Sequence, residues 1–175
     1  MRYAIILSVV IAAAGTVMIP DAQAQTESTR GVDIARAVEL EREAEVASGE
    51  RRRWSRAASL LEEASRLRPE SDPVALANLR MAGTIYGALG QFERAKRTLL
   101  GLADRAIEYG EVATAANVLM DAAHIAVRLN DEPAVRSCYE RANRLAMSSH
   151  LSSEEQRLIT ARLESSRSVF ASVGR

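Results

Sequence analysis

Apolar residues recur every three or four positions along most of the chain, which is the spacing of a helix with one buried side. Glycine, proline and asparagine interrupt this pattern at short intervals. The pattern predicts helices over residues 33–48, 54–67, 73–89, 92–108, 112–129, 132–147 and 152–169. Because the connections between them are short, we expect neighbouring helices to run antiparallel.

Residues typical of helix ends support these boundaries. Asp72 followed by Pro73 is a favoured pair at a helix start. Gly90 follows the third predicted helix, at the position where a left-handed residue commonly closes the last turn. Ser152 and Glu155 have the spacing of a capping box, in which each side chain bonds the backbone of the other residue.

The predicted helices repeat along the chain at a fixed period. When the chain is shifted so that Leu79 falls on Leu119, Ala82 falls on Ala122. Self-similarity of helix pairs at a fixed period is typical of a helical solenoid. We therefore expect an all-α fold, a right-handed α-solenoid of about three antiparallel helix pairs over residues 33–148. A C-terminal capping helix within residues 149–175 is expected to cover the last pair.

The repeated positions resemble those of the tetratricopeptide repeat (TPR). The middle pair carries the resemblance in Leu79, Ala82, Gly83, Tyr86, Gly90, Phe92, Ala95 and Leu99. The first pair matches at Trp54, Ala57, Leu61, Ala64 and Pro69, and the third at Leu119, Ala122, Ala123, Leu129, Tyr139 and Ala142. The period of this chain is longer than that of the TPR family, so we expect longer paired helices.

The first 24 residues have the features of a secretory signal peptide. Arg2 provides a positive start, an apolar run follows, and Ala22 and Ala24 give the small-x-small pattern of a cleavage site. Cleavage would leave Gln25 as the mature N-terminus, with a short flexible tail over residues 25–32 and a periplasmic or secreted location. The alternative is an uncleaved membrane anchor over residues 3–19, at the short limit for a spanning helix.

Composition narrows the classes of function. The 175 residues carry 23 basic and 23 acidic side chains, so the strongly basic surface of a dedicated nucleic-acid binder is not expected. Cys138 is the single cysteine, predicted to be buried and inert, with a reactive thiol as the alternative. We find no metal-ligand spacing, nucleophile motif or phosphate-binding loop, and predict no catalytic, cofactor-binding or metal-binding residues. Residues 51–53, Arg-Arg-Arg, are interpreted as an exposed turn, and the four glutamates over 39–45 as a solvated helix face.

The resemblance also implies a candidate site. In the TPR family the first helix of each pair lines a groove that holds peptide segments. Carried over by position, the groove residues are Arg80, Thr84, Met120, His124, Val127 and Arg128. The arginines are suited to binding carboxylates, and Met120 to an adaptable apolar floor.

These features favour an exported, non-enzymatic module that binds a peptide or partner protein in a helical groove. The alternatives are an adaptor subunit of an envelope assembly, secretion or cell-wall machine and, from a different class, an enzyme. The expected partner is a protein or peptide, or a second copy of the chain. Nucleic acid and stable membrane insertion after signal cleavage are not expected.

Overall fold

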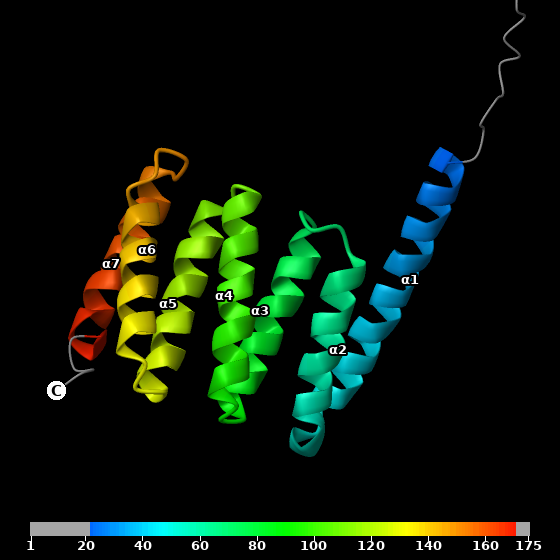
Figure 1. The fold of residues 1–175 in the computed structure, drawn as a ribbon, viewed down its shortest axis with the longest axis horizontal. Helices are drawn as coiled ribbons and strands as arrows, with labels where there is room; N and C mark the ends of the chain where they lie inside the picture. Colours follow the sequence, from blue (N-terminus) through cyan, green and yellow to red (C-terminus); the bar gives the residue numbers. More distant parts are fainter. Residues whose placement is uncertain (1–21, 171–175) are drawn as a thin grey trace, which may run out of the picture.

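The computed structural model describes residues 22–170. Within this range it contains α1 (Ala22–Ser48), the short 3-10 helix η1 (Arg51–Arg53), α2 (Trp54–Leu67), α3 (Pro73–Ala88), α4 (Phe92–Glu108), α5 (Val112–Arg128), α6 (Glu132–Ala146) and α7 (Ser153–Phe170). Each helix packs against the next one in the chain, so the helices stand side by side in sequence order as an elongated row (Figure 1). The expected all-α, solenoid-like architecture is confirmed.

Three evenly spaced helix ends share one backbone geometry. Gly90, Gly110 and Asn130 have φ values of 74°, 77° and 54°. In each case the next residue donates its N–H to the carbonyl five positions back, which is the bond that defines a Schellman motif. These stops delimit α4 and α5 as single-helix units, each half as long as the repeat period found in the sequence.

Fully buried residues, most of them alanine, occupy corresponding positions of successive helices. Ala82, Ala122 and Ala142 are fully buried, as is Leu102, which occupies the equivalent position of α4. The approach is especially close at Gly83, where an added Cβ would lie 2.8 Å from both Cγ and Cδ2 of Leu99. Helices α3 and α4 therefore pack at a separation that only glycine permits without a shift of Leu99.

The first helix is longer than the sequence predicts. It begins at Ala22 instead of near Asp33, so residues 25–32, expected to form a flexible tail, are helical. That segment contains Gly31 but no proline, so the helix nucleated by residues 33–48 can extend through it. The apolar run of the predicted signal peptide lies outside the described residues, as does the alternative anchor. No helix in the described part of the chain has the length and hydropathy needed to span a bilayer.

The last helix covers the α5–α6 pair. Ile159 and Leu163 of α7 are 2% and 3% exposed and belong to the largest apolar cluster, together with residues of α5 and α6. The predicted capping box is present: Ser152 donates its N–H to Glu155 Oε2 at 2.8 Å, and Glu155 returns its N–H to Ser152 Oγ. Helix α7 thus determines how much of α5 remains open.

Candidate functional site

The six residues of the predicted groove fall on two helices with different surroundings. On α3, Arg80 and Thr84 are exposed, on the same side of the helix as Val74 and Met81. Val74 is 42% exposed and Met81 is 57% exposed. Their spacing along the helix places these side chains on one open strip of α3.

The same prediction is wrong for Met120 on α5. This residue has no exposed surface and lies in the core cluster that α5 shares with α6 and α7. His124 is half-buried: its ring lies edge-on to the Phe170 ring of α7 at 5.0 Å, and its Nδ1 donates to the Met120 carbonyl at 2.8 Å. Because α7 packs over this side of α5, neither side chain faces an open groove.

The last two predicted residues lie near the end of α5. Val127 is half-buried, and Arg128 is exposed. The Arg128 guanidinium lies 5.4 Å from the centre of the Phe92 ring, a cation–π distance that links α5 to the start of α4. Arg80 and Arg128 are therefore held by different neighbours.

A line of polar contacts joins α3, α5 and α7. Arg80 reaches Asp121 at 3.4 Å, and Asp121 also accepts from Arg162 of α7. Arg162 also donates to Asn117 Oδ1 at 2.8 Å. Arg80 is the loosest member, with a long contact and a side chain that is 51% exposed. A carboxylate from another molecule would therefore compete with Asp121 for Arg80 more easily than for Arg162.

We name the open part of this surface the α3 strip. It consists of Val74, Ala77, Arg80, Met81, Thr84 and Ala88. It combines apolar side chains with one guanidinium at the α5 side, and its backbone is fixed because α3 packs against both α2 and α4.

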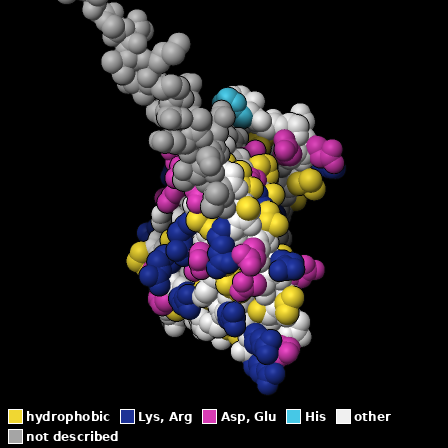
Figure 2. Space-filling view, turned by 90° about the vertical axis from the view of Figure 1, so that its right-hand side faces the viewer, with side chains coloured by type: hydrophobic (Ala, Val, Ile, Leu, Met, Phe, Trp, Pro, Cys, Tyr) yellow, Lys and Arg dark blue, Asp and Glu magenta, His cyan; other side chains and the backbone are white. Residues whose placement is uncertain are grey.

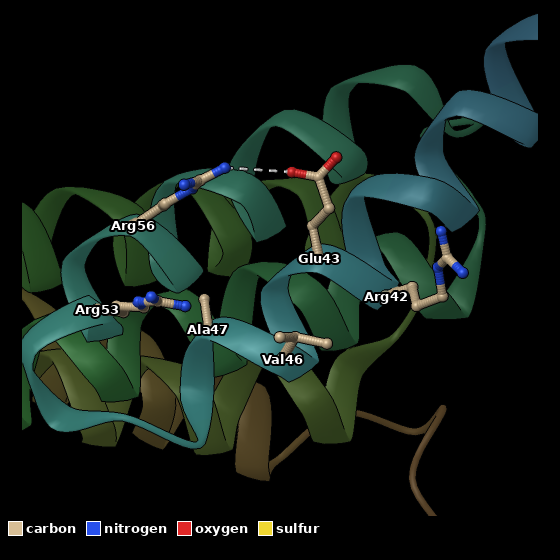
Figure 3. Close-up of a pocket in the computed structure, with 6 residues that line it drawn as sticks. All are labelled: Arg42, Glu43, Val46, Ala47, Arg53 and Arg56. Carbon is tan, nitrogen blue, oxygen red and sulfur yellow. Dashed lines mark hydrogen bonds and ion pairs between the residues drawn. The ribbon is translucent and has the colours of Figure 1, made fainter.

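A second surface lies where α1 turns into α2. A hollow of about 250 Å³ is lined by Arg42, Glu43, Val46, Ala47, Arg53 and Arg56 (Figure 3). In the space-filling view of the α1 end of the row, many dark blue basic side chains lie on the lower half of the face, with acidic and apolar side chains between them (Figure 2). We name this feature the α1–α2 hollow. Residues 51–53 are exposed, as the sequence indicates, but the hollow beside them is not predicted, because Arg42 and Arg56 line it only once α1 and α2 pack together.

One of the four clustered glutamates is not part of a solvated face. Glu41 accepts two bonds from Arg68, at 2.6 and 2.8 Å, and a third from Asn78 of α3 at 2.6 Å. Arg68 also binds Asp72, the N-cap of α3, at 2.8 Å. The bond from Arg68 holds the pKa of Glu41 below its ordinary value, against the opposing effect of burial. This network fixes α1 relative to α2 and α3.

A further polar cluster is committed to structure in the same way. Glu62 of α2 accepts from the Tyr86 hydroxyl at 3.0 Å and from the Thr98 hydroxyl at 2.7 Å, and Arg94 donates to Tyr86 at 2.7 Å. Burial raises the pKa of Tyr86. These groups satisfy one another and join α2, α3 and α4. Among the described residues, no group of three or more His, Cys, Asp or Glu side chains is placed to hold a metal ion.

Comparison with known proteins adds no further assignment. No protein-family model matches this chain, and no curated protein sequence matches it. Any functional assignment therefore depends on the sequence and on the surfaces described above.

Proposed function

We propose that this protein is an exported, non-enzymatic interaction module of TPR-like helix pairs, and that it binds a segment of a partner protein on the α3 strip. One observation carries the proposal. Val74 and Met81 are 42% and 57% exposed on a helix inside the row, where its neighbours α2 and α4 already fix it. Exposed apolar side chains on a rigid surface favour association with another protein.

The chemistry of the α3 strip indicates the kind of segment that fits. Met81 is unbranched and adapts its shape to different apolar side chains. Arg80 lies beside it in the sequence, and its contact with Asp121 is long, at 3.4 Å. A segment with one apolar residue and a nearby acidic residue would use both groups. Export is inferred from the signal-like sequence of residues 1–24.

The test is a comparison of three tagged proteins, each mixed with an extract of the cell envelope. These are the wild type, Met81→Glu and the matched control Met147→Glu, and quantitative mass spectrometry measures the proteins that co-purify. Met147 lies at the C-cap of α6 and is 70% exposed, so both variants place a charge on an exposed methionine position.

We expect a partner that the wild type and Met147→Glu enrich equally, and that Met81→Glu loses by at least tenfold. Circular dichroism must show the same helix content for all three proteins. Equal enrichment by Met81→Glu, or equal loss with Met147→Glu, would show that the α3 strip is not the binding surface.

A further inference from the structure

The α1–α2 connection concentrates positive charge in a protein that has no net charge. Between residues 42 and 56 the chain carries five arginines and three glutamates, whereas the whole chain is balanced at 23 charges of each sign. Local charge of one sign beside low-dielectric walls concentrates ligands of the opposite sign. The α1–α2 hollow lies within this segment.

The ion pairs around the α1–α2 hollow leave its arginines poorly neutralised. Arg56 contacts Glu43 at 3.5 Å, and the two side chains are 70% and 37% exposed. Arg53 shares Glu50 with Arg52 and is the more distant of the two, at 3.4 Å against 2.7 Å.

The third guanidinium of the hollow is Arg42. It is exposed and has no acidic partner among the described residues. Arg53 and Arg56 extend toward α1, whereas Arg42 extends away from them at the edge of the hollow (Figure 3). The hollow and its edge therefore carry three guanidinium groups and one carboxylate, and the contact of that carboxylate with Arg56 is long and exposed, so an incoming anion can replace it.

The start of α2 adds to this field. Arg53 is the N-cap of α2 and Arg56 lies in its first turn, which contains no acidic residue. The N-terminal end of a helix carries partial positive charge, so acidic side chains are favoured there and basic ones are disfavoured. An anion in the hollow would relieve the repulsion between these arginines and the helix end.

Another hollow shows that three arginines alone do not make a comparable site. The hollow between α2 and α4 is lined by Arg94, Arg97 and Arg105 with Glu62. There Arg94 binds the Tyr86 hydroxyl, and Arg105 binds two backbone carbonyls, those of Pro69 and Glu70. Two of those three guanidinium groups are therefore committed to holding the fold, whereas Arg53 and Arg56 of the α1–α2 hollow have only longer ion pairs, at 3.4 and 3.5 Å.

We propose that the α1–α2 hollow binds an acidic segment of a partner protein, with carboxylates on Arg42, Arg53 and Arg56 and an apolar side chain on Val46. Guanidinium groups pair with carboxylates through two parallel hydrogen bonds. Val46 is 67% exposed and lies one turn from Arg42 on α1. A free phosphate has no group to contact Val46. A bilayer surface would have to enter a recess in which Arg53 and Arg56 extend toward α1 (Figure 3).

This site is separate from the α3 strip, so the two proposals fail independently. The probe is a fluorescein-labelled peptide of alternating glutamate and leucine, and its binding to the purified protein is measured by fluorescence anisotropy. The test variant is Arg42→Gln/Arg53→Gln/Arg56→Gln. The matched control is Arg136→Gln/Arg141→Gln/Arg144→Gln, which removes the same number of arginines from a hollow on α6 that also contains Glu132 and Glu140.

We expect the peptide to bind the wild type and the α6 control alike, and the α1–α2 variant at least tenfold more weakly. Raising the salt concentration should weaken binding to the wild type, because screening shortens the reach of exposed charges. A peptide with glutamine in place of glutamate should not bind. Met81→Glu should bind the acidic peptide as the wild type does, which distinguishes this site from the α3 strip.

Four results would overturn the proposal. The first is absence of peptide binding to the wild type, and the second is an equal loss in both arginine variants, which would indicate unspecific charge attraction. The third is displacement of the peptide by inorganic phosphate at equal concentration, which would indicate a simple anion site. The fourth is a wild-type protein that binds phosphatidylglycerol vesicles through the three arginines but does not bind the peptide.

Discussion

Replacing Glu41 with glutamine removes the negative charge that joins α1 to the rest of the row. In the wild type this carboxylate accepts from Arg68 through both oxygens and from Asn78 through one. Glutamine keeps the shape of the side chain but offers one acceptor oxygen and turns an NH₂ group toward the guanidinium. Arg68 then keeps its bond to Asp72 and at most one bond to the neutral glutamine oxygen.

The expected cost follows from burial. A hydrogen bond to a charged group contributes about 1.5–3 kcal/mol. The Arg68 and Glu41 side chains are 11% and 21% exposed, so water screens them only in part. We expect Glu41→Gln to lower the free energy of unfolding by about 2 kcal/mol, which corresponds to about 4–8 °C in Tm for a chain of this size.

Glu39→Gln is the matched control on the same helix. Glu39 pairs with Arg36 at 2.7 Å, as short as the Glu41 contacts, but the two side chains are 51% and 49% exposed. An exposed pair of this kind contributes little to stability, because water screens both charges. The two variants therefore make the same chemical change in two ion pairs that have similar N–O distances but differ in how far the side chains are exposed.

Trp54 allows the unfolding of this region to be followed directly. It is the single tryptophan of the chain, and its indole N–H donates to the Ser48 carbonyl at 2.8 Å across the α1–α2 turn. Urea titration should be monitored by Trp54 fluorescence and by circular dichroism. Equal midpoints for Glu41→Gln and Glu39→Gln would refute the reasoning that burial gives this network its strength.

The pH dependence gives a second measure of the same network. The pKa of Glu41 is lower in the folded protein than its ordinary value of 4.5. A carboxyl group with a lowered pKa stabilises the fold fully above the unfolded value, and this contribution is lost as the pH falls through the lowered value. The difference in Tm between wild type and Glu41→Gln should be constant from pH 7 to about pH 5 and decrease below 4.5. A difference that stays constant to pH 3 would contradict this assignment.

Three further predictions concern packing, a helix end and processing. Gly83→Leu should lower the free energy of unfolding by about 2–3 kcal/mol, because the new side chain overlaps Leu99. Glu43→Leu should leave the free energy of unfolding nearly unchanged, and equal Tm values for the two variants would refute the close packing of α3 on α4. Asn130→Gly should raise the free energy of unfolding by about 0.5–1 kcal/mol, because φ is 54° at this position and glycine adopts this value without strain. A lower urea midpoint for this variant than for the wild type would contradict this prediction. Mass spectrometry of protein from the envelope fraction should find Gln25 as the first residue, and a mass that retains residues 1–24 would favour the anchor.

The sequence predicts the local features of this fold well. The bounds of α2 and α4 agree with the prediction at both ends. The limits of α4 depend on residues close in the chain, the left-handed Gly90 before it and Gly110 after it. The pattern does not predict the start of α1, because helix extension through polar residues leaves no periodic apolar signal. Pro20 and Asp21, which precede Ala22, fall within the residues assigned to the signal peptide.

The candidate surfaces depend on contacts that local patterns do not encode. The repeat period correctly aligns Met120 with Arg80, but it does not reveal that α7 lies over α5 and buries Met120. Likewise, Arg42 and Arg56 belong to different helices and line the same hollow only because α1 and α2 pack against each other. A signal was present in the five arginines between residues 42 and 56. Without the packing of these two helices it resembled an ordinary solvated turn.

The most direct test of the central claim is photo-crosslinking inside the cells that make this protein. Benzoylphenylalanine is placed at residue 77, in the middle of the α3 strip, and in a second strain at residue 147, the C-cap of α6. We predict an ultraviolet-dependent adduct of one defined mass from position 77, absent from position 147 and lost when Met81→Glu is added. An adduct from position 147 with none from position 77 would contradict a partner-binding role for the α3 strip.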